Sequence, residues 1–591
     1  MSSIVLYALH GSVAVIQMNA PPVNSLGLEL RRSVVDCLSR GLATAEVGAI
    51  VLIGSERAFS GGADVRELGT ALVMEEPSLR TVTGLVEDAT KPIIAAVGGA
   101  CMGGGFELAL ACHFRVAAHD AAIALPEVKL GIMPGAGGTQ RLPRAAGLEI
   151  ALDMITTGKT IRAGELRGTG VFDEIIGGDL FGEAIAFAQR LVAERRPLKR
   201  LRDGRIEHPR AEAVLTAAQA SLKETSRGQP APLACVQAIA LTLSTPFDEG
   251  LRLESQLCDR LIATPESKAL RHVFAAERAA GKIPGASAMP ARAVRQVGII
   301  GAGPIGAGLA KSCLDAGLAV VRADPNSAEI GACDLIIEAS PQTPQAKEKI
   351  FADIASQARQ GAILASTDPY TDLNGITAAT RRPQDVVGLH FLNPAQATRV
   401  VEVAISASTG ADVLATCVAF AKRLNKVPVV CSARAGLIGE RLLRHYLTVV
   451  WSLVARGSPQ WQIERALLEF GMTVSPFRAG EAPPSEKGKI EGGLLDDPDI
   501  VARCVYALAN EGALILEEGV AARSSDVDII SIHACGFPAY RGGALHHANE
   551  VGLERVAAAV KRFGEDAGPE ESYWRIAPLL VQLAAAHKRF G

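Results

Sequence analysis

Aromatic residues are scarce in this sequence: Phe, Trp and Tyr make up 4% of its 591 residues. With 59 glycines in the chain, this scarcity favours close backbone packing over aromatic stacking platforms. Neither sign of charge is in marked excess, because 60 Lys and Arg against 63 Asp and Glu give a net charge of −3. We therefore expect neither nucleic acid nor an anionic membrane surface as a partner.

The sequence also lacks a disulfide pattern, a metal-binding pattern and a membrane span. Its 11 cysteines include no Cys-x-x-Cys pair, so we expect reduced, buried thiols and no metal site. No apolar run reaches the roughly 18 to 20 residues that a membrane span needs, so we expect no membrane insertion. The N-terminal stretch has no basic leader, and HKRFG at the other end is no peroxisomal or retention signal. These absences predict a cytoplasmic protein.

The length of the chain predicts about three to four domains. Residues 1–190 alternate strand-like runs, such as VAVIQM, GAIVLIG and FRVAAHDAAIAL, with helical stretches, which is an α/β pattern. Residues 191–290 are charged and helical and end in a linker helix that starts at Pro265. Residues 291–430 contain a second α/β pattern, and residues 431–591 are mostly helical. The sequence thus predicts a multidomain α/β protein with these four parts.

Two glycine-rich turns in the first part have unusual backbone chemistry. They are RAFSGGADVREL (57–68) and CMGGGFELAL (101–110). Glycines at a helix start let a ligand approach the backbone, where free N–H groups and the helix dipole favour negative charge. Two such turns facing each other form an oxyanion hole. Glu107 lies just inside the second turn and Glu127 follows 20 residues later, a pairing that suits proton transfer beside a carbonyl. Either feature alone is more often purely structural.

The joint pattern resembles the crotonase (enoyl-CoA hydratase/isomerase) superfamily over most of residues 1–190. The resemblance is carried by AFSGGADVREL, GGGFELAL and LPEVKLGIMPGAGGTQRL. It implies a spiral crotonase fold and an acyl-CoA thioester as substrate. It also implies that the main-chain N–H groups of Ala63 and Gly104 hold the thioester oxygen.

The same resemblance assigns roles to the two glutamates. It implies that Glu107 and Glu127 hold a water near C3 of a trans-2-enoyl-CoA. Glu127 is then expected to supply the proton to C2, while Glu107 helps to activate the water. The same pair is able to shuttle protons in double-bond isomerisation.

A second constellation begins with GAGPIG, a G-x-G-x-x-G motif at residues 301–306. It follows the strand-like QVGII and opens a helical stretch, and the next strand-like run ends at Asp324. This context favours a dinucleotide site in a shortened, Rossmann-like parallel sheet over a structural turn. We expect NAD to contact Gly301, Gly303 and Gly306, with Asp324 at the adenine ribose.

Further along, DVVGLHFLNPAQATRVVEVA is similar to the 3-hydroxyacyl-CoA dehydrogenase family. The resemblance implies that His390 is the catalytic base and that Glu402 orients it. DLIIEAS resembles the segment that lines the nicotinamide end, which adds Glu338 and Lys347 to the cofactor site. Nearly the whole chain, with GFPAYRGGALHHANEVGL near its end, resembles the type-1 multifunctional enzymes of β-oxidation. In these enzymes a hydratase half precedes a dehydrogenase half.

The dehydrogenase-like half departs from its family in three ways, which we treat as independent. Pro325–Cys333 replaces several dozen residues that include an edge strand and a CoA-contacting hairpin. Pro369 and Tyr370 lie where the family has a serine that binds the substrate hydroxyl. Glu440 replaces an active-site asparagine, and a carboxylate repels developing negative charge and cannot donate as an amide does.

Three functions remain open at this point. The first is an enoyl-CoA hydratase fused to an impaired dehydrogenase-like half, with or without an additional isomerase activity. The second is a working hydratase and NAD-dependent dehydrogenase. The third is a non-catalytic regulatory protein that binds CoA and a dinucleotide. The paired glutamates argue against the third, and the lost serine and asparagine favour the first over the second. We expect a monomer or a small homo-oligomer.

Overall fold

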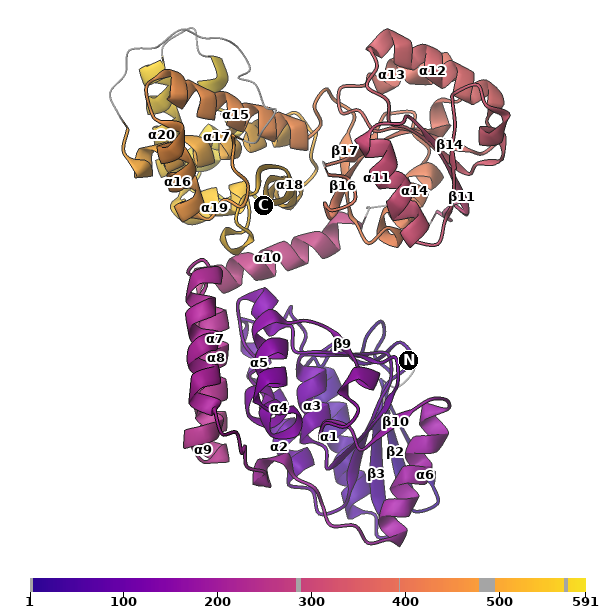
Figure 1. Ribbon diagram of the computed structural model, residues 1–591, viewed down its shortest axis with the longest axis vertical. Coiled ribbons are helices and arrows are strands. Elements are labelled where there is room, and N and C mark those ends of the chain that lie inside the picture. Colours follow the sequence, from indigo (N-terminus) through magenta and orange to yellow (C-terminus); the bar gives the residue numbers. More distant parts are fainter. Residues whose placement is uncertain (1–3, 283–288, 393, 478–494, 568–571) are drawn as a thin grey trace. The chain divides into compact units, whose positions relative to one another are not determined.

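The computed structural model describes residues 4–282, 289–392, 394–477, 495–567 and 572–591. It divides into two compact units, Met1–Arg271 and His272–Gly591, with the division inside helix α10 (Pro265–Ala280) (Figure 1). Helix α10 begins at the proline that was expected to start the linker helix. The four segments expected from the sequence stay a prediction, and each compact unit is described by itself.

The first unit is built on a six-stranded sheet that is parallel except for its first pair. In order, its strands are β1 (Val5–His10), β2 (Val13–Met18), β3 (Ala49–Ile53), β5 (Ile93–Val97), β7 (Phe114–Ala118) and β10 (Glu174–Ile176). β3 and β5 are buried along their whole length, as expected for strands that are covered on both faces. One covering layer is α6 (Leu180–Ala193), which packs on β2, β3, β5 and β7.

A second, four-stranded sheet has the order β4 (Ala58–Ser60), β6 (Ala100–Met102), β8 (Ala122–Ala124), β9 (Ile161–Arg162). Its first three strands follow β3, β5 and β7 directly along the chain, so three successive turns of chain each add one strand to both sheets. This repetition is the predicted crotonase spiral. The run FRVAAHDAAIAL, read as one strand-like stretch, forms β7 and β8 in different sheets.

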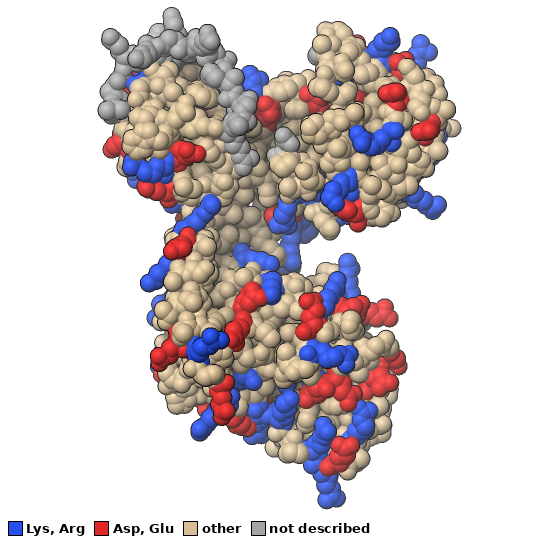
Figure 2. Space-filling model, viewed as in Figure 1, with Lys and Arg blue, Asp and Glu red and all other residues tan. Residues whose placement is uncertain are grey.

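Helices complete the first unit. They are α1 (Leu28–Ala43), α2 (Leu79–Glu87), α3 (Gly104–Ala111), α4 (Gly138–Ala146), α5 (Leu148–Thr157), α7 (Ala211–Thr225), α8 (Pro230–Ser244) and α9 (Phe247–Ile262). α3 is buried at every residue, which explains its apolar sequence, and it packs against α2 and α4. Figure 2 shows acidic and basic side chains interspersed on the visible face of this unit, in keeping with the balanced composition.

The second unit contains a seven-stranded sheet with helices on both faces. Its order is β12 (Ala319–Arg322), β11 (Gln296–Ile300), β13 (Leu335–Glu338), β14 (Ile363–Ser366), β15 (Val386–Phe391), β16 (Val400–Ile405), β17 (Val427–Ser432), all parallel except β15 with β16. One face packs on α11 (Pro304–Asp315) and α14 (Ala411–Arg423), the other on α12 (Pro344–Gln357) and α13 (Leu373–Thr380). β12 is an edge strand, and only the short 3-10 helix Ala328–Ala332 connects it to β13.

The remainder of the second unit is helical, as predicted. It comprises α15 (Gly439–Ala455), α16 (Gln460–Phe470), α17 (Asp497–Glu517), α18 (Ser524–Cys535), α19 (Ala544–Val551), α20 (Leu553–Ala567) and α21 (Pro578–Ala585). α17 is the central helix and contacts α15, α16, α19, α20 and α21. Within the described ranges of the chain, no helix has the length and apolar character that crossing a bilayer requires.

Candidate active sites

Two turns of the first unit bring the main-chain N–H groups of Ala63 and Gly104 together. A Cβ atom placed on Gly104 would lie 3.2 Å from the nitrogen of Ala63. Gly104 is the first residue of α3, so its N–H has no helical acceptor. Among the described residues, neither N–H has a hydrogen-bond acceptor. Two converging, unpaired N–H groups are the arrangement that stabilises an oxyanion.

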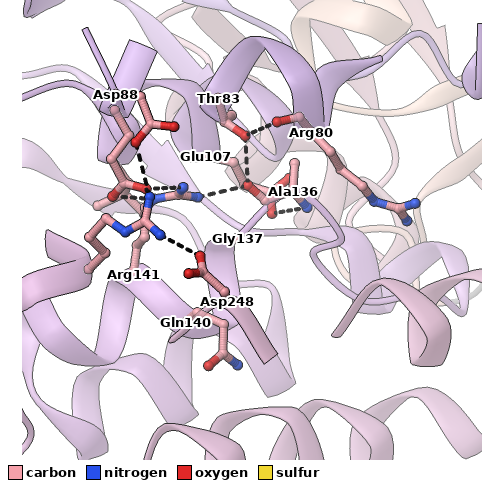
Figure 3. A network of polar contacts seen from close by, with 12 residues as sticks. Arg80, Thr83, Asp88, Glu107, Ala136, Gly137, Gln140, Arg141 and Asp248 are labelled. Carbon is pink, nitrogen blue, oxygen red and sulfur yellow. Dashed lines mark hydrogen bonds and ion pairs between the residues drawn. The ribbon is translucent and has the colours of Figure 1, made fainter. Parts of the chain in front are cut away.

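Glu107 lies in the first turn of α3, with 2% of its surface exposed. Its Oε1 accepts hydrogen bonds from the N–H groups of Ala136 and Gly138, both at 2.8 Å. Figure 3 shows this contact beside the Arg80–Thr83 segment. Burial raises the pKa of Glu107, and the two N–H groups oppose that rise. The side chain is thereby fixed while its second oxygen stays available.

Glu127 begins a 3-10 helix, Glu127–Leu130, and lies beside the glycine turn before α3. A Cβ atom on Gly103, which has φ +51°, would lie 2.8 Å from Oε1 of Glu127. Its Oε2 is buried and has no hydrogen-bond partner within the described part of the chain. Burial, followed by the charge of Glu107, raises the pKa of Glu127 well above its ordinary value. Glu127 therefore retains its proton more readily than an ordinary glutamate.

One pocket is lined by Glu107, Glu127 and the two unpaired N–H groups together. The empty space at this pocket, counted together with open solvent at its mouth, is about 710 Å³. Most of the remaining wall is apolar and includes Leu26, Leu68, Val73, Met74, Leu79, Ile132, Met133 and Ile262. The four residues predicted for the hydratase site thus meet at one place.

Another buried glutamate near this site, Glu254 on α9, was not predicted from the sequence. It is 0% exposed and accepts hydrogen bonds from the N–H groups of Gly137 at 2.6 Å and Thr139 at 3.0 Å, and from the Thr139 hydroxyl. Burial, followed by the charge of Glu107, raises the pKa of Glu254. The one signal in the sequence is its place on the buried stripe of α9, between Gly250 and Cys258.

In the second unit, the GAGPIG turn lies between β11 and α11. Gly301 has φ +118°, and a Cβ atom there would lie 2.7 Å from the carbonyl oxygen of Ala339. A Cβ atom on Gly306 would collide with the carbonyl of Gly301, whereas Gly303 has no atom within 4 Å of that position. Asp324 is exposed and lies just beyond the end of β12. Gly303 and Asp324 are therefore open to a dinucleotide.

Glu338 and Lys347 form a buried ion pair, with Lys347 Nζ 2.8 Å from Glu338 Oε2. Lys347 also donates to the carbonyl of Ser340 at 3.0 Å, and the other Glu338 oxygen accepts from the Ser340 N–H at 2.7 Å. The side chain of Glu338 is 0% exposed and that of Lys347 is 2% exposed. Both charges are thus satisfied within the protein at the carboxyl end of β13.

His390 and Glu402 are directly opposite each other on the antiparallel strands β15 and β16. His390 Nδ1 lies 2.6 Å from Glu402 Oε2, and Glu402 Oε1 accepts from the N–H groups of Ile438 at 2.8 Å and Gly439 at 3.1 Å. The carboxylate is fully buried while the imidazole remains partly exposed. This arrangement fixes the ring and leaves Nε2 for a substrate proton.

Two of the three family departures contact each other. Tyr370 donates a hydrogen bond to Oε1 of Glu440 at 3.1 Å, and Arg444 donates to the Tyr370 hydroxyl at 3.3 Å. The Arg444 guanidinium also lies 5.7 Å from the centre of the Tyr370 ring. The expectation that the departures are independent is wrong for this pair, because one replacement supplies the partner of the other.

Comparisons with known proteins agree with both halves. Residues 9–227 match the family model described as enoyl-CoA hydratase/isomerase, and residues 321–434 match the NAD-binding domain of 3-hydroxyacyl-CoA dehydrogenase. The second match begins after the GAGPIG turn.

Related proteins align with almost the whole chain. The peroxisomal bifunctional enzyme of Danio rerio is 30% identical, covering 97% of this chain and 96% of the relative. The human enzyme of the same name is 28% identical, with 94% of each chain covered. The peroxisomal fatty acid beta-oxidation multifunctional protein MFP2 of Arabidopsis thaliana is 29% identical, with 94% of each chain covered. These names do not confirm the expected cytoplasmic location. The chain belongs to the family of bifunctional β-oxidation enzymes, which join an enoyl-CoA hydratase to a 3-hydroxyacyl-CoA dehydrogenase.

Proposed function

We propose that the first unit adds water across the double bond of a trans-2-enoyl-CoA, with Glu107 and Glu127 as its catalytic residues. The observation that carries this proposal is the meeting of two buried carboxyl groups and two unpaired N–H groups in one pocket. The apolar wall of the pocket suits an acyl chain.

The N–H groups of Ala63 and Gly104 bind the thioester oxygen in this proposal. Negative charge develops on that oxygen when water attacks C3, because the electrons of the double bond move towards the carbonyl. The two N–H groups stabilise this enolate-like charge in a site shielded from water. Removing one such donor from an enzyme costs about 3 kcal/mol of transition-state stabilisation.

The two glutamates move the protons. Glu107, held by two N–H groups at one oxygen, accepts a proton from water as the bond between the water oxygen and C3 forms. Glu127, whose pKa is raised by burial and then by the charge of Glu107, donates its proton to C2. One proton enters the pair and one leaves it, so a proton passing from Glu107 to Glu127 through a water resets the site. If the two glutamates moved a proton from one carbon atom of the substrate to another, the site would have isomerase activity.

We propose further that the dehydrogenase half works poorly on straight-chain substrates. His390, oriented by Glu402, is placed to take the proton of a 3-hydroxyl group. Bound NAD would accept the hydride, and the open Gly303 together with the exposed Asp324 fits such a cofactor. Tyr370 and Glu440 are the residues that slow this reaction in our proposal. A carboxylate near the substrate oxygen repels the negative charge that develops on that oxygen during oxidation.

A fully working bifunctional enzyme is the second candidate, and the intact His390–Glu402 pair favours it. One experiment separates the two. The purified protein is mixed with a trans-2-enoyl-CoA, with and without NAD, while enoyl absorbance and NADH are followed together. Loss of enoyl absorbance without NADH supports the first proposal, and both signals support the second. Neither signal would support a non-catalytic binding protein. The cytoplasmic location and the oligomeric state stay predictions.

A further inference from the structure

Glu254 and Glu107 bind opposite sides of one short segment of main chain. Glu107 accepts the N–H groups of Ala136 and Gly138, and Glu254 accepts those of Gly137 and Thr139. Four successive amides therefore alternate between two buried carboxyl groups. A shift of this segment, hereafter the 136–139 segment, would displace both carboxyl groups at once.

The remaining contacts of the 136–139 segment do not duplicate those of Glu254. Arg141, which is paired with the buried Glu87, donates to the carbonyl of Ala136 at 2.9 Å, and Thr83 donates to the same carbonyl at 3.4 Å (Figure 3). Both contacts hold the start of the segment. At its end, Gln140 donates to the Thr139 hydroxyl at 3.1 Å and the N–H of Arg141 donates to the carbonyl of Gly137 at 2.8 Å, so neither of these contacts binds an amide that Glu254 binds. Glu254 is the acceptor found, within the described residues, for the N–H groups of Gly137 and Thr139.

We infer that Glu254 is a positioning residue of the hydratase: it fixes the 136–139 segment so that Glu107 stays aimed at the water. This inference rests on the proposed hydratase function. Glu254 itself contacts no substrate in this scheme, because it lines a different pocket from the one that Glu107 and Glu127 line. It acts through the amides that it shares with Glu107.

Charge gives Glu254 a second effect on the site. The titratable and charged groups that influence it or respond to it are Glu107, Glu127, Arg80, Arg141, Cys235 and Cys258. The charge of Glu254 raises the pKa of Glu127, although burial and Glu107 act more strongly. Burial raises the pKa of Glu254 itself to about 8, so removing its carboxyl lowers the pKa of Glu127 over the alkaline range in which Glu254 is ionised. Glu127 works in its protonated form. The alkaline limb of the pH–activity profile, where hydration falls as Glu127 loses its proton, would therefore move to lower pH.

The test compares Glu254→Gln with Glu249→Gln, an exposed glutamate of the same helix that is paired with Arg252. A glutamine has one acceptor oxygen in place of two, so it cannot hold both amides as the carboxylate does. We expect Glu254→Gln to lower kcat by about 10- to 100-fold, the effect of a small misplacement of a catalytic group, with KM changed by less than about threefold. The alkaline limb of its pH–activity profile should shift to lower pH. Glu249→Gln should leave both kcat and this limb unchanged.

Two further measurements keep the inference testable. Hydrogen exchange at residues 136–139 should be faster in Glu254→Gln, whether or not the protein hydrates any substrate. Glu254→Asp, which keeps the charge but is shorter, should keep the alkaline limb of the wild type and recover only part of kcat. Unchanged kcat and unchanged exchange in Glu254→Gln would overturn the inference, as would slower turnover with an unshifted limb. Faster exchange in a protein whose wild type lacks hydration would refute the proposed function and leave the anchoring of the segment intact.

Discussion

Replacing Glu127 by glutamine separates the catalytic role of this carboxyl group from its effect on stability. Glutamine has nearly the same size but carries no transferable proton. A general acid or base contributes about 10²- to 10⁴-fold to a rate, so we expect hydration to fall by that factor. At 1.36 kcal/mol for each factor of ten, the barrier rises by about 3 to 5 kcal/mol.

The same substitution should stabilise the first unit, and the gain should depend on pH. In an unfolded chain a glutamate ionises near pH 4.3, whereas burial and the charge of Glu107 keep Glu127 protonated to higher pH in the folded state. Between these two pKa values the folded state binds one more proton than the unfolded state. Stability therefore falls by about 1.4 kcal/mol for each pH unit of rise. Glu127→Gln removes this dependence, so its advantage over the wild type should grow with pH and then level off.

The stability measurement has to report on the first unit alone. The three tryptophans, Trp451, Trp461 and Trp574, all belong to the second unit, so their fluorescence does not serve. Hydrogen exchange of α3 amides, corrected for intrinsic exchange rates, gives the opening free energy between pH 4 and pH 8. Glu249→Gln is again the matched control. Wild-type hydration in Glu127→Gln, or two stability curves that stay parallel over this range, would refute the reasoning.

Three other variants test separate parts of the two sites. Gly103→Ala puts a methyl group 2.8 Å from Glu127 Oε1 at a residue with positive φ, so hydration should fall about tenfold or more. The control is Gly84→Ala, whose added methyl group has no atom within 4 Å, and it should stay active. His390→Gln should lower NADH formation by about 10²-fold and leave hydration unchanged, and equal loss of both activities would count against a separate dehydrogenase site. The double variant Tyr370→Ser, Glu440→Asn restores the family residues and should raise NADH formation about tenfold or more, corresponding to about 1.4 kcal/mol. If NADH formation by this double variant is unchanged, the cause of the slow dehydrogenase reaction lies in the shortened β12–β13 connection instead.

The hydratase site was predictable because its geometry is encoded locally. The glycine before α3 needs a positive φ, and the helix that follows exposes its first N–H, so a few adjacent residues specify both the turn and the amide. Glu107 lies in that same helix. The spiral fold follows from strand pairs that repeat along the chain. The roles of the glutamates came from the family resemblance, and the geometry described above leaves them as proposals.

Glu254 was not predictable in the same way, because its partners are distant in the sequence. It is separated by 117 residues from Gly137 and by 115 from Thr139. From the sequence, Glu254 is only a glutamate on the apolar stripe of a helix. The sequence does not indicate which donors such a buried carboxyl group binds. The contact between Tyr370 and Glu440 spans 70 residues and was missed for the same reason. Local patterns specify turns and helix starts, whereas buried polar pairs depend on how distant elements pack.

The dehydrogenase half shows which of its family features bear on activity. Gly301 and Gly306 leave no room for a side chain, and the buried charges of Glu338 and Lys347 need each other whether or not NAD binds. Packing alone therefore accounts for these four residues, and their presence says nothing about turnover. His390 is different, because part of its imidazole is exposed, although the buried carboxylate of Glu402 also accepts two N–H groups at the start of α15. Among these residues, only the partly exposed ring of His390 goes beyond what packing explains, and it is the observation that favours retained dehydrogenase chemistry.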